Sequence, residues 1–221
     1  AVRPHGMKMF QQLWHGGHHA LPRDRTPPWS ASAVPSVEVG VVPIAMTKSM
    51  IDEIVEGYAA AARRCEAWGL DGVDIHCAHG YLPGQFLSAN TNKREDEYGG
   101  PFENRARFAV EVIEAVRNAS SRDFVVGVRV APDLAVNGVD ETGNLKLAQM
   151  LEARNLIDYV NVSMGSYNAF PKMIGGMHEP VGYEMPTSAV ITGQVKSPTM
   201  VIGRFRTLEE CDQLIRNGGG D

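Results

Sequence analysis

Long apolar runs are missing from this 221-residue sequence, and so is a basic start followed by an apolar stretch. The first absence argues against a membrane-spanning helix, and the second against a secretory signal peptide. Basic residues are also few, since 21 Lys and Arg stand against 26 Asp and Glu, for a formal net charge of −5. Phosphate-binding faces need positive charge, so we expect no nucleic acid among the partners. Because a membrane span and a signal peptide are both missing, we expect a cytoplasmic protein with no membrane partner.

Cysteine is scarce as well. The three cysteines, Cys65, Cys77 and Cys211, lie far apart and form no C-x-x-C pair. This spacing argues against a disulfide framework, a zinc ribbon and an iron–sulfur site within the chain. We expect all three to be small buried residues of a reducing compartment.

What the sequence does have is a regular alternation of strand and helix patterns, in five units. The helix at 49–68 has Ser49 and Asp52 as its start signal and Gly69 as its stop, and the last helix opens on the capping box Thr207–Glu210. The expected strands cover 8–14, 71–76, 124–130, 157–163 and 199–203, and the expected helices 49–68, 102–119, 142–154, 183–194 and 207–218, with a long loop over 15–46.

Strands that alternate with helices give parallel sheets, either doubly wound or closed into a (β/α)8 barrel. No G-x-G-x-x-G or P-loop follows any strand, which weakens the doubly wound interpretation. Polar residues on one strand face, among them Gln12, Asp74 and Asn161, suit the C-terminal mouth of a barrel. We therefore predict a (β/α)8 TIM barrel of which the third to seventh units are present, in a chain truncated at both ends.

Two histidines end the strand "DGVDIH" and its loop. Alternation directs His76 towards the barrel axis, and a turn after it would let His79 converge on the same point. Such a pair binds either a metal ion or a ligand oxygen, and the spacing alone does not decide between them. A metal site needs a third ligand, for which His15, His18 and His19 are candidates.

Arginines near two strand ends suggest electron-rich ligands. Arg129 faces the same interior, where its partner is either Asp74 in a structural ion pair or the edge of a ligand. The Gly203–Arg204 dipeptide enters a helix where barrels often bind phosphate.

The segment "GLDGVDIHCAHGYLPGQFLSANTNKREDEYGGPFENRARFAVEVIEAV" strongly resembles the Old Yellow Enzyme family of flavin-dependent NAD(P)H oxidoreductases. The resemblance is to the branch of enoate reductases, 2,4-dienoyl-CoA reductases and amine dehydrogenases. "QQLWHGG", "VVGVRV" and "VIGRFRTLEE" fit the same family in the same order. The resemblance implies that His76 and His79 bind the substrate oxygen and that Tyr81 donates a proton to the substrate Cα. Tyr167 lies in the substrate loop, where dienoyl-CoA reductases place a catalytic His.

The same resemblance implies FMN as cofactor and NAD(P)H as reductant, with no metal. Gln12 and Arg129 match residues beside the flavin ring, and Gly203 and Arg204 match part of its phosphate loop. The implied reaction takes hydride from NAD(P)H to FMN and then from flavin N5 to the Cβ of an enone or enoate.

The resulting prediction is an FMN-dependent NAD(P)H oxidoreductase that reduces the activated C=C bond of an α,β-unsaturated carbonyl or enoate. An amine-dehydrogenase-like flavoenzyme is the first alternative, although those members have Tyr where this chain has His76. A metal-dependent barrel hydrolase that uses His15, His76 and His79 is the second.

Residues 1–221 are expected to form a partial FMN-binding barrel domain, without the first two strands and the eighth. Unpaired sheet edges favour aggregation, so we expect this fragment alone to bind FMN weakly or not at all and to lack activity. The expected partners are a small-molecule substrate and further copies of the chain in a homo-oligomer.

Overall fold

A parallel sheet of five strands organises residues 3–221, the part of the chain that the computed structural model describes. Its strand order is β1-β4-β5-β6-β7, and every neighbouring pair is parallel. All five expected strands are confirmed, each slightly shorter than its sequence pattern: β1 is Phe10–Leu13, β4 Gly72–His76, β5 Val125–Val130, β6 Tyr159–Val162 and β7 Thr199–Val201.

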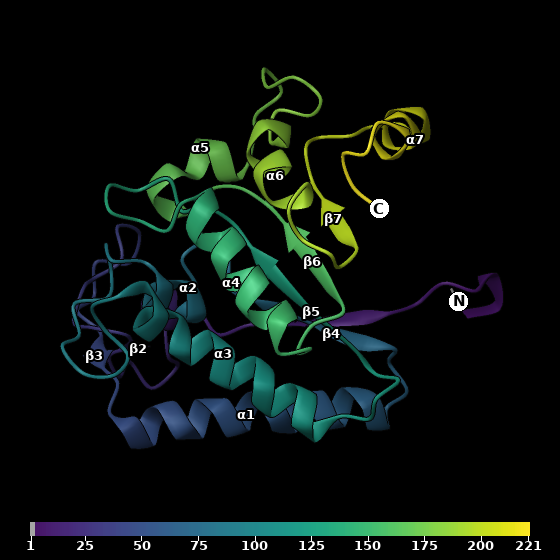
Figure 1. Cartoon of the computed structure of the whole chain (residues 1–221). Helices are drawn as coiled ribbons and strands as arrows, with labels where there is room; N and C mark the ends of the chain where they lie inside the picture. The colour runs from purple at the N-terminus through teal and green to yellow at the C-terminus, as the bar shows by residue number, and fades with distance from the viewer. Residues whose placement is uncertain (1–2) are drawn as a thin grey trace.

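Helices cover one face of this sheet, where α4 lies in front of the strands and α3 and α1 follow below it, with α1 packed along α3 (Figure 1). Their apolar residues and the outward residues of the strands, such as Val73, Ile75 and Val128, form one buried core. The opposite strand face is therefore left for the polar side chains. The longer helices are α1 Lys48–Ala67, α3 Phe102–Ala119, α4 Glu141–Ala153, α6 Met185–Thr192 and α7 Leu208–Arg216.

Helix ends agree with their sequence signals except at the start of α1. There the N-cap is Thr47 instead of Ser49, because the Thr47 hydroxyl accepts a hydrogen bond from the backbone N–H of Met50 at 3.3 Å. The stop at Gly69 is confirmed by its φ of +79° just after the helix. The capping box that begins α7 is confirmed, with Thr207 and Glu210 each bonded to the other's backbone.

Several short elements were absent from the sequence-based prediction. The loop expected over 15–46 contains a second parallel sheet made of β2 (Trp29–Ser30) and β3 (Ile44–Ala45). These pieces are too short to display a period, so no pattern could reveal them. The others are the helices α2 Leu82–Leu87 and α5 Phe170–Met173 and the 3₁₀ turns η1 Arg3–His5, η2 Gly17–His19 and η3 Tyr167–Ala169.

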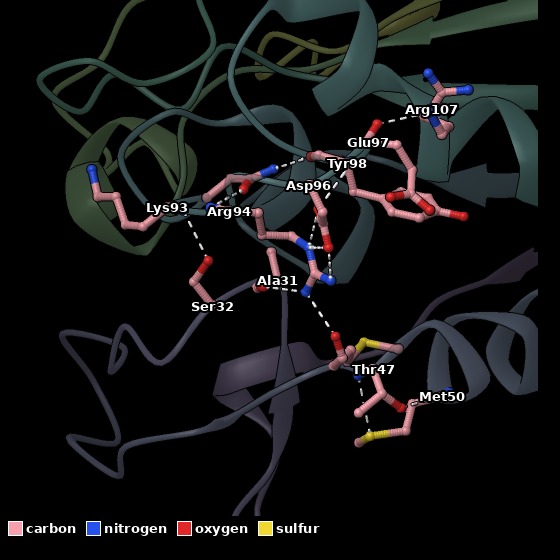
Figure 2. A network of polar contacts seen from close by, with 12 residues as sticks. Ala31, Ser32, Thr47, Met50, Lys93, Arg94, Asp96, Glu97, Tyr98 and Arg107 are labelled. Carbon is pink, nitrogen blue, oxygen red and sulfur yellow. Dashed lines mark hydrogen bonds and ion pairs between the residues drawn. The ribbon is translucent and has the colours of Figure 1, made fainter.

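Arg94 anchors the loop after α2 to the segment that carries the small sheet (Figure 2). Its guanidinium donates to the backbone carbonyls of Ala31 at 2.9 Å and Met46 at 2.7 Å, and its Nε donates to Asp96 at 2.9 Å. The Asn92 amide donates to the carbonyl of Phe86 in α2 and to that of Tyr98 in the same loop. This charged stretch therefore has a structural role, since it holds the loop after α2 in place.

At the amino ends of the strands, two aromatic rings cover the polar face of the sheet. Phe10 and Tyr159 stack with ring centroids 5.4 Å apart, across the two strands that lie between them. Gly127 makes room for this, since a Cβ there would lie 2.1 Å from Cζ of Tyr159. The polar side chains of the site lie between these rings and the carboxyl ends of the strands.

All three cysteines are free thiols. Cys65 and Cys77 are buried as expected, whereas Cys211 is only half-buried. Among the helices of residues 3–221, none combines the length and the apolar character needed to cross a membrane.

Candidate active site

Strand register brings the predicted site residues onto two adjoining layers of the polar face. His76 on β4 pairs with Arg129 on β5, and Arg129 pairs with Asn161 on β6. One layer below, Gln12 on β1 pairs with Asp74 on β4. Because side chains alternate along a strand, the two layers share one face at the carboxyl end of the sheet.

Asp74 is the hub of the lower layer. Its Oδ2 accepts hydrogen bonds from the amides of Gln12 at 2.7 Å and Asn161 at 3.2 Å, while its Oδ1 is buried without a partner. Burial raises the pKa of this carboxyl above its usual range, and the two amide bonds partly oppose the rise. The hub fixes Gln12 in place below the histidines.

Arg129 has few partners for a half-buried guanidinium. One terminal nitrogen donates to the Ser163 hydroxyl at 3.3 Å, and Nε is buried without a partner. Burial lowers the pKa of the Arg129 guanidinium, and the negative charges of Asp74 and Glu184 oppose this change. The guanidinium nevertheless forms no ion pair with either carboxylate. Of the two alternatives, this geometry favours an electron-rich ligand edge over a structural ion pair.

His76 and His79 converge as expected. The chain turns sharply after β4, with a φ of +60° at His79, and the two ring centroids lie 5.2 Å apart. Burial is the first cause of a pKa of about 3 for His76 and of about 4 for His79, and Arg129 lowers both further. Both imidazoles are therefore neutral at neutral pH.

Tyr81 stands beside the pair, at the N-cap of α2. Its ring centroid lies 4.8 Å from that of His76 and 4.9 Å from that of Trp14. Its hydroxyl lies 3.2 Å from the hydroxyl of Tyr167, and this hydrogen bond is the first cause that raises the pKa of Tyr167 to about 12. Tyr167 thus contacts the site through Tyr81.

A cavity of ≈ 430 Å³ opens on the outer side of the two tyrosines. His19 stacks on Tyr167 with centroids 4.2 Å apart, and its Nδ1 lies 3.6 Å from a carboxylate oxygen of Glu38. The cavity offers room for a small ligand next to the Tyr81 hydroxyl. It is lined by Trp14, His19, Ala20, Leu21, Glu38, Val39, Tyr81 and Tyr167.

Two other histidines, His15 and His18, bind backbone groups. His18 bonds the carbonyl of Val34 through Nδ1 at 2.9 Å, and Nδ1 of His15 accepts the backbone N–H of Gly17 at 3.1 Å. Within residues 3–221, no group of three or more His, Cys, Asp and Glu side chains is arranged to hold a metal ion.

Gly203 and Arg204 lie apart from the histidines, after β7. Gly203 packs against Gly182, whose N–H donates to its carbonyl at 2.6 Å. The Arg204 guanidinium donates to the carbonyls of Gly176 and Glu179 instead of extending outward. Its side chain is therefore committed to the loop between β6 and α6.

Two positioning residues escaped the sequence analysis. Gln85 is fully buried on α2, and its amide bonds the backbones of Gly16 and His18 in one segment and of Gly80 in another, which ties the two segments together. Gly165 holds His79 through its carbonyl, at 2.9 Å from Nδ1. A glutamine among apolar residues was a visible signal, whereas a backbone carbonyl 86 residues away leaves none.

Comparison with known proteins gives this site its context. The sequence model of the NADH:flavin oxidoreductase / NADH oxidase family matches residues 1–221, the whole chain. The chain belongs to this family. The resemblance to the Old Yellow Enzyme family of flavin-dependent oxidoreductases is thereby confirmed.

Curated relatives cover the full chain at about one-third identity. An NADH oxidase of Thermoanaerobacter brockii is 33% identical over 225 aligned positions, and the chain covers 34% of it. An NADPH dehydrogenase of Clostridium acetobutylicum is 34% identical, and the chain covers 63% of it. The chain thus spans between one third and two thirds of the length of these relatives.

Solved structures show the same fold. Morphinone reductase in complex with tetrahydroNAD has a TM-score of 0.77 at 28% identity, over 100% of this chain and 62% of that one. Histamine dehydrogenase from Rhizobium sp. 4-9 has a TM-score of 0.86 at 27% identity, over 98% and 32%. These are barrels of the Old Yellow Enzyme type, in agreement with the parallel α/β sheet seen here.

Proposed function

We propose that this protein is an FMN-dependent NAD(P)H oxidoreductase that reduces the activated C=C bond of an α,β-unsaturated carbonyl or enoate. The observation that carries the proposal is the convergence of His76 and His79, 5.2 Å apart, with the Tyr81 ring 4.8 Å from His76. Oxygen-binding groups and a proton donor therefore lie together at the carboxyl end of a parallel sheet, where barrel enzymes build their sites.

The polar face offers groups that suit a flavin. Arg129 has a buried Nε without a partner and Asp74 a buried Oδ1 without one, as expected beside a polar ligand edge. Gln12 and Arg129 would hold the pyrimidine side of the ring. Because the Arg204 side chain is bound to carbonyls, the backbone amides of Gly203 and Arg204 would hold the phosphate ahead of α7.

When bound, FMN supplies the hydride chemistry that links NAD(P)H to the alkene. The protein supplies the rest. His76 and His79 bind the substrate oxygen and favour the negative charge that develops there. Tyr81 gives the proton of its hydroxyl to the α-carbon, and Trp14 packs on the Tyr81 ring and helps to hold it in place.

We propose further that the five strands correspond to the third to seventh of an eight-stranded barrel, and residues 1–221 to part of an FMN-binding domain. Coverage of 62% of the morphinone reductase chain and the sequential order of the five parallel strands here support this assignment. A small molecule is the expected partner of the site.

The first test is an absorption spectrum of the purified protein with the sequence that flanks residues 1–221 restored, because these residues alone are expected to bind FMN weakly or not at all. We expect flavin bands that bleach under anaerobic NADH or NADPH and return when an α,β-unsaturated acid or ketone is added. His76→Asn should weaken the second step without preventing the first. A colourless protein that takes up no FMN would contradict the proposal.

An amine-dehydrogenase activity is the second candidate, because the TM-score of 0.86 to histamine dehydrogenase exceeds that to morphinone reductase. The two candidates differ in the direction of electron flow. Bleaching of the flavin bands by an amine, with no reoxidation by an alkene, would favour the dehydrogenase. The His pair favours the reductase.

A further inference from the structure

Glu184 is a buried carboxylate that the proposed chemistry does not use. It lies at the N-cap of α6, only 5% of its surface is exposed, and its Oε2 has no hydrogen-bond partner. A buried carboxylate without its full set of partners lowers the stability of the folded protein, and a neutral glutamine of the same shape would lower it less. A carboxylate at such a position therefore calls for a functional explanation.

Contacts at the start of α6 place Glu184 at the end of the sheet that carries Arg129. The Thr187 hydroxyl, in the first turn of the helix, lies 3.5 Å from Sδ of Met164. Met164 directly follows Ser163, whose hydroxyl accepts a hydrogen bond from Arg129 at 3.3 Å. The N–H of Thr187 in turn donates to the Glu184 carbonyl at 3.1 Å. The first turn of α6 and the guanidinium therefore share the carboxyl end of β5 and β6.

The charges of Glu184 and Arg129 act on each other across this space. Burial raises the pKa of the Glu184 carboxyl, and Tyr183 and Arg129 oppose the rise. The N-terminus of α6 also favours the charged form of a carboxyl group at its N-cap. Within residues 3–221 no ion pair links Glu184 to the guanidinium, whose Nε has no partner, so its N–H groups stay available to a ligand.

Asp74 is the other carboxylate whose charge acts on Arg129, but it has a different role. Its Oδ2 accepts hydrogen bonds from the amides of Gln12 and Asn161, so it organises the lower layer of the site. Glu184 makes no such bond with an amide in the described part of the chain. Its contribution to the site is therefore its charge.

We propose that Glu184 is the counter-charge of Arg129 and lowers the reduction potential of the bound flavin. The inference rests on the proposed function, because it requires FMN to lie against Arg129. A hydride from NAD(P)H brings two electrons and one proton to the ring, so the ring gains one negative charge, which the guanidinium stabilises. A carboxylate close to the guanidinium offsets part of that stabilisation. Glu184 acts through the charge of Arg129, so it is a positioning residue and not a catalytic one.

A lower potential suits a flavin that gives its electrons to an alkene. With the positive charge of Arg129 alone, the reduced flavin would be more stable and therefore a weaker hydride donor. Glu184 makes reduction by NAD(P)H less favourable and reduction of the alkene more favourable by the same factor. An amine dehydrogenase has the opposite need, because its flavin accepts electrons from the substrate. Of the two candidate activities, a carboxylate at this position favours the reductase.

The direct test is the reduction potential of FMN in the protein with its flanking sequence restored, measured at pH 7 by anaerobic equilibration with a reference dye. Glu184→Gln should raise the potential by roughly 30 mV, a tenfold shift towards the reduced form for a two-electron couple. Because glutamine keeps the shape of the side chain and removes its charge, a purely structural role would leave the potential in place. A potential that is unchanged or lower in this variant would overturn the inference.

Glu141→Gln is the matched control. Glu141 lies on α4, and one of its carboxylate oxygens is 3.5 Å from the Thr187 hydroxyl, so it borders the same turn of α6. Its charge is not among those that act on Arg129. This variant should change the redox equilibrium by less than about twofold. An equal rise in both variants would reflect net charge alone, and it would overturn the assignment to Glu184.

The second test needs no FMN. It is a double-mutant cycle of Arg129→Gln and Glu184→Gln, followed by urea unfolding of the FMN-free protein. With Glu184 present, the loss of Arg129 leaves a buried carboxylate without its compensating charge. Arg129→Gln should therefore lower the ratio of folded to unfolded protein roughly fivefold more in the wild-type background than in the Glu184→Gln background. Equal losses in the two backgrounds would show that the charges are not coupled.

The two proposals fail in different ways. A protein that binds no FMN refutes the reductase function, and with it the effect on the flavin, while the double-mutant cycle still tests the pairing of Glu184 with Arg129. A protein that binds FMN and reduces alkenes, yet has the same reduction potential with Glu184→Gln, refutes the role of Glu184 alone.

Discussion

At the residue scale, the hydrogen bond between Tyr81 and Tyr167 is the contact with the clearest consequence. The two hydroxyls lie 3.2 Å apart, and a pKa of about 12 keeps Tyr167 protonated and able to donate. When Tyr81 gives up its proton to the substrate, a donor at this distance stabilises the phenolate that forms. Tyr167 is therefore a positioning residue for the proton donor.

Replacing Tyr167 by Phe should slow alkene reduction roughly three- to tenfold, the worth of one neutral hydrogen bond. Reduction of FMN by NAD(P)H should be unchanged, because no proton from Tyr81 is needed there. Stopped-flow measurement of the two half-reactions over a range of pH would check this, since the rate loss should come with an altered pH profile of the second half-reaction.

Tyr81→Phe is the matched variant, with an expected loss of roughly 10²–10⁴ in the same half-reaction. Phe170→Leu serves as the control, because Phe170 stacks on Tyr167 but has no hydroxyl. Equal losses in both half-reactions of Tyr167→Phe would argue for a purely structural role.

The histidines also show how far single residues can be interpreted from sequence. Alternation along "DGVDIH" placed His76 on the polar face, and the pair was expected to converge if the chain turned, as it does. The hydrogen bond that holds the His79 ring could not be predicted, because its partner is the carbonyl of Gly165, which is 86 residues from His79. Contacts of that separation leave no periodic trace in a sequence.

At the element scale, strand β5 has a glycine, Gly127, where the Tyr159 ring lies across it. A Cβ on Gly127 would lie 2.1 Å from Cζ of Tyr159, a side chain held by its stack on Phe10. Gly127→Ala should therefore lower the free energy of unfolding by about 1–3 kcal/mol, the usual cost of overpacking. Urea unfolding followed by circular dichroism would measure it.

Gly57→Ala is the control for the same chemical change. Gly57 lies in the middle of α1, and an added Cβ would meet nothing within 4 Å. Since Ala is the better helix former, this variant should gain about 0.4–1 kcal/mol. A loss in both variants, or a gain in both, would show that packing against Tyr159 is not the cause.

Elements differ in how well their sequences announce them. α3 was expected over 102–119 and has those bounds, because its apolar face repeats over five turns. The helix α2 spans only Leu82–Leu87, and all six residues are buried, so it shows no polar face and no period. The elements that place Tyr81 and Gln85 were thus the ones that sequence periodicity could not supply.

At the scale of the whole molecule, the sheet separates two environments. One face is packed against α1, α3 and α4, and the other carries buried polar groups whose partners are incomplete, among them Asp74 and Arg129. Folding tolerates these groups because the apolar face supplies the stability. The free energy of unfolding should therefore depend on pH through the buried titratable groups of the site.

His19, His76 and His79 have folded pKa values of about 4, about 3 and about 4, all lowered first by burial from an ordinary 6.5. Between pH 6.5 and about 4 the unfolded chain binds protons that the folded protein does not. The stability that these rings contribute is therefore complete above pH 6.5 and is lost as pH falls through this window. Asp74 acts in the opposite sense, because burial raises its pKa.

A variant isolates one ring from this sum. His76→Gln should reduce the slope of unfolding free energy against pH by about 1.4 kcal/mol per pH unit between pH 4.5 and 6, the effect of one proton. Urea unfolding at several pH values gives the slope directly. His178→Gln is the control for the same substitution at an exposed side chain. An equal slope in the wild type and His76→Gln would mean that burial does not lower the pKa of His76 in the folded protein.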